Sequence, residues 1–248
     1  MAILNQIGTL AQLYVRRLNY TKIDFSNRSN HVFDYHGVKI SWLGHDSFRI
    51  QNGKTIIIDP FKLQSSPGKA DILLVSHEHF DHLSIDDIKK VINENTTIVT
   101  IQSVKKELSG LKVKEIRTVK PGDKLKIGDV SIEIVPAYNL NKFREPGKVF
   151  HPKEDGKAGF VIGIKGVRIY HAGDTDLVPE MKGLKPDVAL LPVSGTYVMT
   201  PEEAAQATKM IEPKLVIPMH YGAIVGSEQD AHRFKQLVTV EVQILKPE

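Results

Sequence analysis

The chain has 248 residues, of which 41% are hydrophobic and 25% are charged. These values are typical of globular proteins, and no apolar run approaches the roughly 18–20 residues that cross a bilayer, which excludes disordered, collagen-like and membrane-embedded classes. The net charge of +4 is scattered along the chain instead of clustered, and cysteine is absent, so a nucleic-acid-binding face, a disulfide framework and a thiolate site are not favoured.

Residues 1–30 are predicted to be an N-terminal extension that precedes a domain spanning residues 31–248. A helix is expected over residues 7–18. Arg16 and Arg17 follow the apolar stretch 7–15, whereas a secretory signal has its basic residues before the apolar stretch. We therefore expect a cytoplasmic protein without a membrane partner.

The domain begins with short β-rich segments that are separated by turn residues. Asn52-Gly53 is a strong hairpin signal, and Ser84 precedes Asp86 and Asp87 as a helix N-cap precedes acidic first-turn residues. Strands are predicted over residues 31–35, 38–43, 47–51, 54–59, 72–75, 96–101 and 113–119, and helices over residues 84–93 and 104–109.

The second half repeats this pattern of a β-meander followed by alternating strands and helices. Thr200-Pro201-Glu202-Glu203 is a capping box with proline at the first helical position. Strands are predicted over residues 124–127, 130–136, 159–164, 167–171, 187–193, 214–218 and 239–245, and helices over residues 200–211 and 228–237. The repetition predicts an α+β fold in which two mixed β-sheets pack face to face with helices outside.

The densest group of ligand-type residues follows the predicted buried strand 72–75. His77, His79, Asp81 and His82 lie within six positions at a strand-to-helix turn. In an extended backbone His77 and His79 point to the same side, because side chains alternate with period two. Imidazole and carboxylate groups bind zinc, manganese and iron, so the segment predicts a metal site.

Two later residues are placed in the same way. Asp174 follows the strand 167–171 in a Gly-Asp-Thr turn, and His220 follows the strand 214–218. Ligand clusters in layered α/β folds gather at the carboxyl ends of strands. The alternatives are an Asx turn for Asp174 and a buried structural histidine for His220. His31, His36, His171 and His232 are expected to be structural or surface residues.

The segment from His77 to His82 resembles the H-x-H-x-D-H signature of the metallo-β-lactamase superfamily. The resemblance covers residues 38–245. It includes Ile58-Asp59-Pro60, the Gly173-Asp174-Thr175 turn and the strand that ends at His220. Trp42-Leu43-Gly44-His45-Asp46-Ser47-Phe48 and Pro218-Met219-His220-Tyr221 resemble the branch that contains ascorbate-6-phosphate lactonase and many uncharacterised metal-dependent hydrolases.

The resemblance implies a four-layer αββα sandwich and hydrolysis by a metal-bound hydroxide. Two divalent ions are expected, zinc or manganese, with iron also compatible. The first ion would be held by His77 and His79, the second by Asp81, His82 and His220, and Asp174 would lie between them. Asp81 is the predicted catalytic residue, which would orient the hydroxide or shuttle a proton.

One position departs from the family pattern. Most members have a further histidine ligand where this chain has Asn139, and His151 is the only other histidine before the next predicted strand. Either His151 replaces that ligand or the first metal is held by fewer nitrogens. Because Pro152 biases His151 towards an extended backbone, we expect its imidazole to point inward.

The substrate is predicted to be a small anionic phosphoester or lactone. Arg144 and Lys148 lie in the loop that contains His151 and would bind the negative charge of the substrate. His45 follows a strand and would contact either the metal or the substrate. A solvated loop is the alternative for the cations. The sequence is compatible with a homo-oligomer, and nucleic acid is not an expected partner.

Two other functions remain to be compared with hydrolysis of a small molecule. The first is a nuclease or RNA-processing phosphodiesterase of the same superfamily, but the spacing of the motifs leaves no room for a large inserted domain. The second is a non-catalytic metal-binding regulatory protein, an alternative that Asn139 keeps open although ligand-type residues occur at four separate segments.

Overall fold

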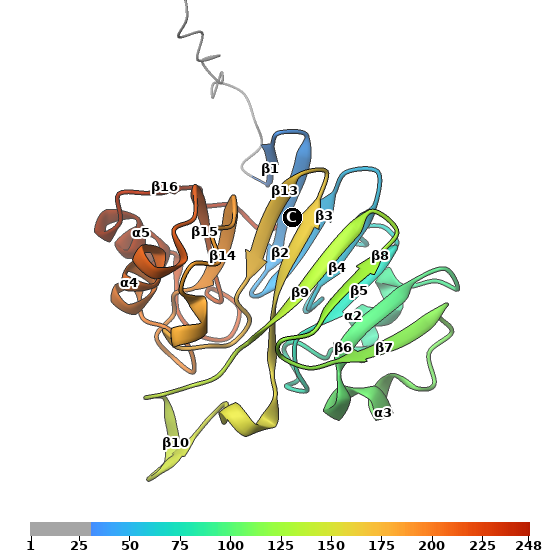
Figure 1. Cartoon of the computed structure of the whole chain (residues 1–248), viewed down its shortest axis with the longest axis horizontal. Coiled ribbons are helices and arrows are strands. Elements are labelled where there is room, and N and C mark those ends of the chain that lie inside the picture. The colour runs from blue at the N-terminus through green and yellow to red at the C-terminus, as the bar shows by residue number, and fades with distance from the viewer. Residues whose placement is uncertain (1–30) are drawn as a thin grey trace, which may run out of the picture.

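Two seven-stranded β-sheets form the centre of the protein, which a computed structural model describes over residues 31–248 (Figure 1). The predicted extension 1–30 and its helix lie outside the described residues. The first sheet has the order β1 (Val32–Tyr35), β2 (Val38–Gly44), β3 (Ser47–Gln51), β4 (Thr55–Ile58), β5 (Ile72–Val75), β6 (Thr97–Ile101) and β7 (Glu115–Val119). The second has the order β16 (Glu241–Val242), β15 (Leu215–Met219), β14 (Val188–Pro192), β13 (Val167–His171), β12 (Ala158–Ile164), β9 (Val130–Pro136) and β8 (Lys124–Ile127).

Tight turns set the register of the antiparallel part of each sheet. His36 and Gly37 both have positive φ, at 51° and 82°, as a two-residue hairpin turn requires. Their turn aligns Tyr35 with Val38. The turn at Asn52 and Gly53 then aligns Phe48 with Ile58 in β3 and β4.

The remaining strands are parallel, and the inner ones are buried on both faces. β4 to β7 form one parallel run and β13 to β16 form the other. β5, β6, β14 and β15 are entirely buried, which explains the largely apolar sequences of these strands. The loops that follow β5, β13 and β15 therefore begin at the carboxyl ends of strands, where ligands bind in such folds.

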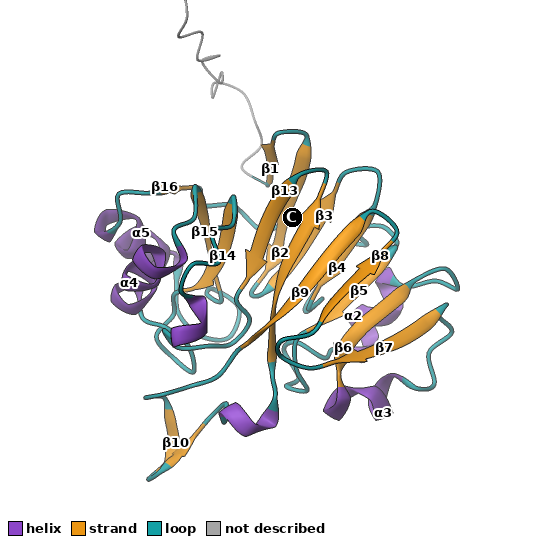
Figure 2. Ribbon diagram, viewed as in Figure 1, coloured by secondary structure: helices purple, strands orange, loops and turns teal. Residues whose placement is uncertain are grey.

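Helices cover the ends of this sandwich, and their caps agree with the sequence. α2 (Ile85–Val91) begins at Ser84, whose side chain accepts a hydrogen bond from the Asp87 backbone N–H. α4 (Pro201–Ile211) has the predicted capping box between Thr200 and Glu203. α5 (Glu228–Leu237) lies with α4 near β14 and β15, whereas α2 and α3 (Lys105–Leu108) lie near β5 to β7 (Figure 2).

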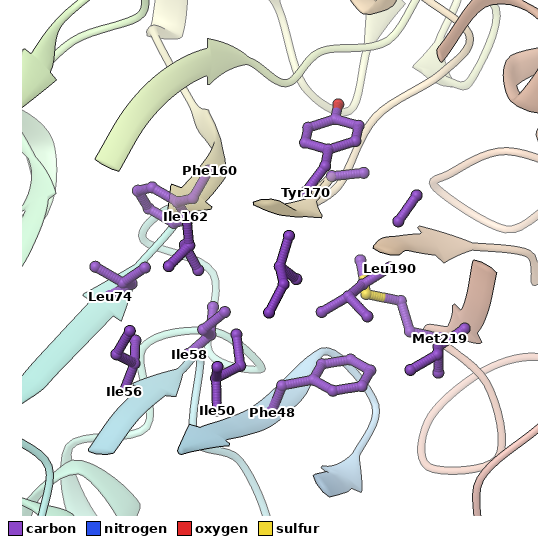
Figure 3. Close-up of a cluster of buried hydrophobic side chains, with 14 of the residues drawn as sticks. Phe48, Ile50, Ile56, Ile58, Leu74, Phe160, Ile162, Tyr170, Leu190 and Met219 are labelled. Atoms are coloured by element: carbon purple, nitrogen blue, oxygen red, sulfur yellow. The ribbon is translucent and has the colours of Figure 1, made fainter. Parts of the chain in front are cut away.

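The hydrophobic core lies between the two sheets. Figure 3 shows Phe48, Ile50 and Ile58 of the first sheet close to Phe160 and Ile162 of the second. All five side chains are fully buried. At about 1.5–3 kcal/mol for each large apolar side chain removed from water, this layer is a main source of stability. The predicted α+β sandwich of two facing sheets is confirmed.

Element boundaries differ from the predictions mainly in the irregular segments. The predicted strand 239–245 shortens to β16, and the predicted helix 104–109 is a 3₁₀ turn followed by α3. The long loop after β9 contains a small hairpin, β10 (Phe143–Glu145) with β11 (Lys148–Val149), that the sequence did not predict. Within residues 31–248, no helix is both long and apolar enough to span a membrane.

Candidate metal centre

The loops at one edge of the sandwich bring seven ligand-type side chains from distant segments together. His77, His79, Asp81 and His82 follow β5, Asp174 follows β13, and His220 follows β15. His151 comes from the segment between β11 and β12. The placement of these residues agrees with the sequence prediction, including that of His151.

The first cluster consists of His77, His79, His151 and Asp174. The Nδ1 atom of His79 lies 3.1 Å from Nε2 of His77 and 3.2 Å from Nε2 of His151. The Asp174 Oδ2 atom lies 3.4 Å from His151 Nε2 and 3.9 Å from His77 Nε2. Ligand atoms that are each about 2.0–2.2 Å from one ion at tetrahedral angles lie about 3–3.5 Å apart. Three of these four distances match that spacing and the His77–Asp174 distance is longer, so the four residues are the candidate ligands of a first ion.

The second cluster lies on the other side of the Asp174 carboxylate. Asp174 Oδ1 is 3.2 Å from His82 Nε2 and 3.4 Å from His220 Nε2. The two oxygens of Asp174 therefore face different imidazole groups. A carboxylate placed in this way could serve an ion on each side, as expected for Asp174 from the sequence.

Hydrogen bonds to the outer ring nitrogens orient the imidazoles. His82 Nδ1 lies 2.8 Å from Asp59 Oδ2, His77 Nδ1 lies 2.9 Å from Ser76 Oγ, and His220 Nδ1 lies 3.0 Å from Ser194 Oγ. Each contact leaves Nε2 directed at the centre. Such outer partners fix the ring tautomer and raise the basicity of a ligand. The hydrogen bonds to His77, His82 and His220 therefore favour the binding of a cation by their Nε2 atoms.

Asn139, the departure from the family pattern, is the positioning partner of His151. Its Oδ1 accepts hydrogen bonds from the His151 backbone N–H at 3.0 Å and from Nδ1 at 2.7 Å. Its amide group donates to the Tyr197 carbonyl at 2.8 Å and to Asp176 at 3.2 Å. The amide thus turns His151 Nε2 towards the first cluster, a role that the sequence prediction missed.

Asp81 and His45 form a pair beside the second cluster. His45 Nε2 donates to Asp81 Oδ2 over 3.0 Å, whereas that oxygen is 3.8 Å from His82 Nε2. Burial alone would raise the pKa of Asp81, but His45 and His82 outweigh it and hold the pKa below its ordinary value. Asp81 is therefore ionised at neutral pH and able to accept a proton.

A cavity of about 350 Å³ opens onto the first cluster and Asp81. It is lined by His79, Phe80, Asp81, Phe150, His151, Asp174, Tyr197 and Ile224. The predicted substrate cations are not part of this lining, because Arg144 and Lys148 lie on the β10–β11 hairpin and are exposed. Lys148 is instead paired with Glu145 at 3.1 Å. His45 lines a neighbouring cavity of about 450 Å³ together with Trp42, Phe61 and Tyr221.

The two clusters differ in how readily their imidazoles hold protons. Burial lowers the pKa of His151 to about 4. Burial acts in the same direction on His220, but the Asp174 and Asp46 carboxylates outweigh it and raise its pKa to about 9. Burial opposes ionisation of Asp174, yet His82 and His220 hold its pKa well below its ordinary value. A cation would replace protons in the second cluster but enter a neutral first cluster.

The low pKa of His151 predicts how the stability of the metal-free protein depends on pH. Between the unfolded value of 6.5 and the folded value of about 4, the unfolded chain binds a proton at this residue and the folded protein does not. This contribution to stability is present above pH 6.5 and is lost as the pH falls. The free energy of unfolding of chelated protein, measured by urea denaturation, should therefore depend less on pH in His151→Ala. Parallel profiles for the variant and the parent would contradict this assignment.

Comparison with known proteins identifies the family. A beta-lactamase superfamily domain model matches residues 39–220. The chain belongs to the metallo-β-lactamase superfamily. A UPF0173 metal-dependent hydrolase of Methanopyrus kandleri is 35% identical over 227 residues, which cover 85% of this chain and 97% of the relative. A UPF0173 metal-dependent hydrolase of Archaeoglobus fulgidus is 35% identical over 228 residues, 85% of this chain and 96% of the relative.

Solved structures agree with this assignment of the superfamily. A crystal structure of a protein from Parabacteroides distasonis, assigned as a metal-dependent hydrolase, superposes with a TM-score of 0.74. Its sequence is 32% identical, and the match covers 88% of this chain and 98% of that one. Igni18, a metallo hydrolase from Ignicoccus hospitalis, has a TM-score of 0.68 at 26% identity, with 85% and 95% of the two chains covered. The protein is a metal-dependent hydrolase of this superfamily.

Proposed function

We propose that the protein uses two divalent metal ions to hydrolyse a small ester or lactone that carries an apolar group. We infer the substrate class from the apolar lining of the cavity. Phe80, Phe150, Tyr197 and Ile224 surround the clusters, and the Phe150 and Tyr197 rings meet edge to face at 4.6 Å between centroids. An apolar wall of this kind gains free energy from burying hydrocarbon, not from binding a second charge.

The residues of the chain fit the two metal positions. His77, His79, His151 and Asp174 would hold the first ion. His82, His220 and Asp174 would hold the second, with Asp81, its other predicted ligand, beside them. Divalent ions supply an activated water and Lewis-acid polarisation of the scissile carbonyl group. Zinc and manganese both suit imidazole and carboxylate ligands, and iron is also compatible.

The proton transfer is assigned to Asp81. Its carboxylate lines the cavity and is held by His45, which restricts its rotation and stabilises its ionised form. Asp81 would accept the proton of the attacking water and return it to the leaving alkoxide. His45 is thus a positioning residue that acts through Asp81.

The predicted anionic phosphoester has little support from the cations near the cavity. Lys148, one of the two predicted substrate cations, pairs with Glu145, and the neighbouring Lys142 and Lys153 pair with Glu203 and Glu180. Arg144 lies on β10, away from the cavity lining. A lactone or ester therefore replaces a phosphoester as the first substrate to test, with a phosphodiester kept as the comparison that represents a nuclease.

A homologous series of lactones and esters tests the substrate class. Each buried methylene is worth about 0.8 kcal/mol, so kcat/KM should rise up to about fourfold for each carbon until the cavity is filled. Phe80→Ala should remove most of this dependence on length. Because Phe80 is 68% exposed, the variant should fold normally. The kinetics are measured with zinc-loaded and with manganese-loaded protein.

Phe143→Ala is the matched control. Phe143 is also exposed, at 53%, but it lies on β10 outside the cavity lining. This variant should retain the full dependence on chain length. Faster turnover of a phosphodiester than of any lactone or ester, with no effect of Phe80→Ala, would reject the proposed substrate class.

A further inference from the structure

Asp46 is a buried carboxylate whose two oxygens make no hydrogen bond within the described part of the chain. It lies in the turn between β2 and β3 and is completely buried. Leaving a buried carboxylate without partners is costly, because the group loses its water without compensation. Neither the sequence motifs nor the ligand set above gives Asp46 a role.

Several of the buried atoms without a hydrogen bond lie around the same point. Among residues 31–248 they include Asp46 Oδ1 and Oδ2, His82 Nε2, Asp174 Oδ1 and His220 Nε2. Asp46 Oδ2 lies 3.7 Å from His82 Nε2, and one ligand atom from each of these four residues lies within 4.8 Å of the others. A cation at this point would satisfy all of these groups at once.

The backbone holds Asp46 in this place. The carbonyl of Asp46 accepts a hydrogen bond from His171 Nε2 at 2.9 Å, and His171 Nδ1 accepts one from the Gly173 N–H at 3.2 Å. The preceding carbonyl, of His45, accepts a hydrogen bond from the His220 N–H at 3.1 Å. The turn is therefore tied to the segments that carry Asp174 and His220.

We propose that Asp46 is a ligand of the second metal ion, together with His82, Asp174 and His220. The inference rests on the proposed two-metal site and completes it. The second position then has two carboxylates and two imidazoles, whereas the first has one carboxylate and three imidazoles. Carboxylate ligands favour manganese and imidazole ligands favour zinc, so the second position should accept manganese more readily than the first.

The assignment also explains the position of Asp81. The Asp81 oxygen nearest to His82 is already bound by His45. Because Asp46 would supply a carboxylate from the β2–β3 turn, Asp81 does not need to bind the ion permanently. It stays available for proton transfer at the cavity.

Metal binding to Asp46→Asn and Asp46→Ala tests the proposal. Full-length protein is freed of metal by chelation and titrated with manganese and zinc by calorimetry, and bound metal is counted by atomic emission. The parent should bind two equivalents, and both variants should bind the second at least about tenfold more weakly. His151→Ala shows which binding event belongs to the first metal position, because this variant should lower the metal affinity of that position only.

Thermal unfolding separates a ligand from a structural residue. If Asp46 serves the metal, its removal should leave the Tm of chelated protein unchanged or higher, because an unsatisfied buried carboxylate is lost. The rise of Tm on addition of manganese should shrink, since stabilisation by a ligand follows its affinity. A structural carboxylic acid would instead give a lower Tm in chelated variants.

Two results would overturn the proposal, and they can be told apart. Variants that bind both equivalents with the affinity of the parent exclude Asp46 as a ligand and leave the proposed function intact. A parent protein that binds fewer than two equivalents removes the two-metal site itself, and with it both the proposed function and the role of Asp46.

Discussion

Replacing Asp174 by alanine should abolish nearly all hydrolysis and reduce the bound metal from two equivalents to one or fewer. The two oxygens of Asp174 face His151 and His77 on one side and His82 and His220 on the other. Its removal leaves each position short of a charged ligand. We expect kcat/KM to fall on the order of 10³-fold or more, which corresponds to at least about 4 kcal/mol of transition-state stabilisation. Metal analysis and kinetics on metal-replete protein measure both effects.

Asp176→Asn is a useful comparison for Asp174→Ala. Asp176 is a buried carboxylate two residues further along the chain, but it accepts hydrogen bonds from the backbone N–H groups of Leu140 and Asn141. Its replacement should lower the Tm more than the metal content. If Asp174→Ala retained two equivalents of metal, Asp174 would not be a bridging ligand, and its position would have to be explained by hydrogen bonding to the histidines.

His151→Ala should weaken binding of the first metal by about 100-fold or more, whereas Asn139→Ala should weaken it by about 10–100-fold. The first variant removes a ligand. The second removes the oxygen that holds His151 Nδ1 at 2.7 Å and leaves the ligand itself in place. A competition titration with a chromogenic chelator measures the affinity of the first site in both variants.

Lys148→Ala is the control for the His151 and Asn139 variants. Lys148 lies in β11, within the same segment between β9 and β12 that contains Asn139 and His151. It is exposed and paired with Glu145. Its removal should leave the affinity of the first site unchanged. A larger loss of affinity in Asn139→Ala than in His151→Ala would reverse the two roles and make the amide the residue on which the first site depends.

The sequence predicted the fold and most of the centre because both depend on local patterns. The apolar runs of β5 and β15 mark buried strands, and the residues directly after them are ligands by type. The inward position of His151 also followed from local features, namely the absence of another histidine and the extended backbone favoured before Pro152. The caps at Ser84 and Thr200 fixed two helix starts.

Features that depend on tertiary contacts could not be predicted in this way. Asp46 looks like an ordinary turn residue, and only the packing of the β2–β3 turn against the segments of Asp174 and His220 shows its surroundings. Similarly, the interaction of Asn139 with His151 spans twelve positions. Arg144 and Lys148 do not line the cavity because they lie on the β10–β11 hairpin, which the sequence did not predict.

The division of the ligands between the two sheets has a consequence for folding. His77, His79 and His82 belong to the half of the chain that forms the first sheet, and Asp174 and His220 belong to the half that forms the second. Neither half can assemble the proposed site alone, so metal ions bound as proposed would link the two sheets. Metal should then bind late in folding, after the halves have docked, and should slow unfolding more than it speeds folding.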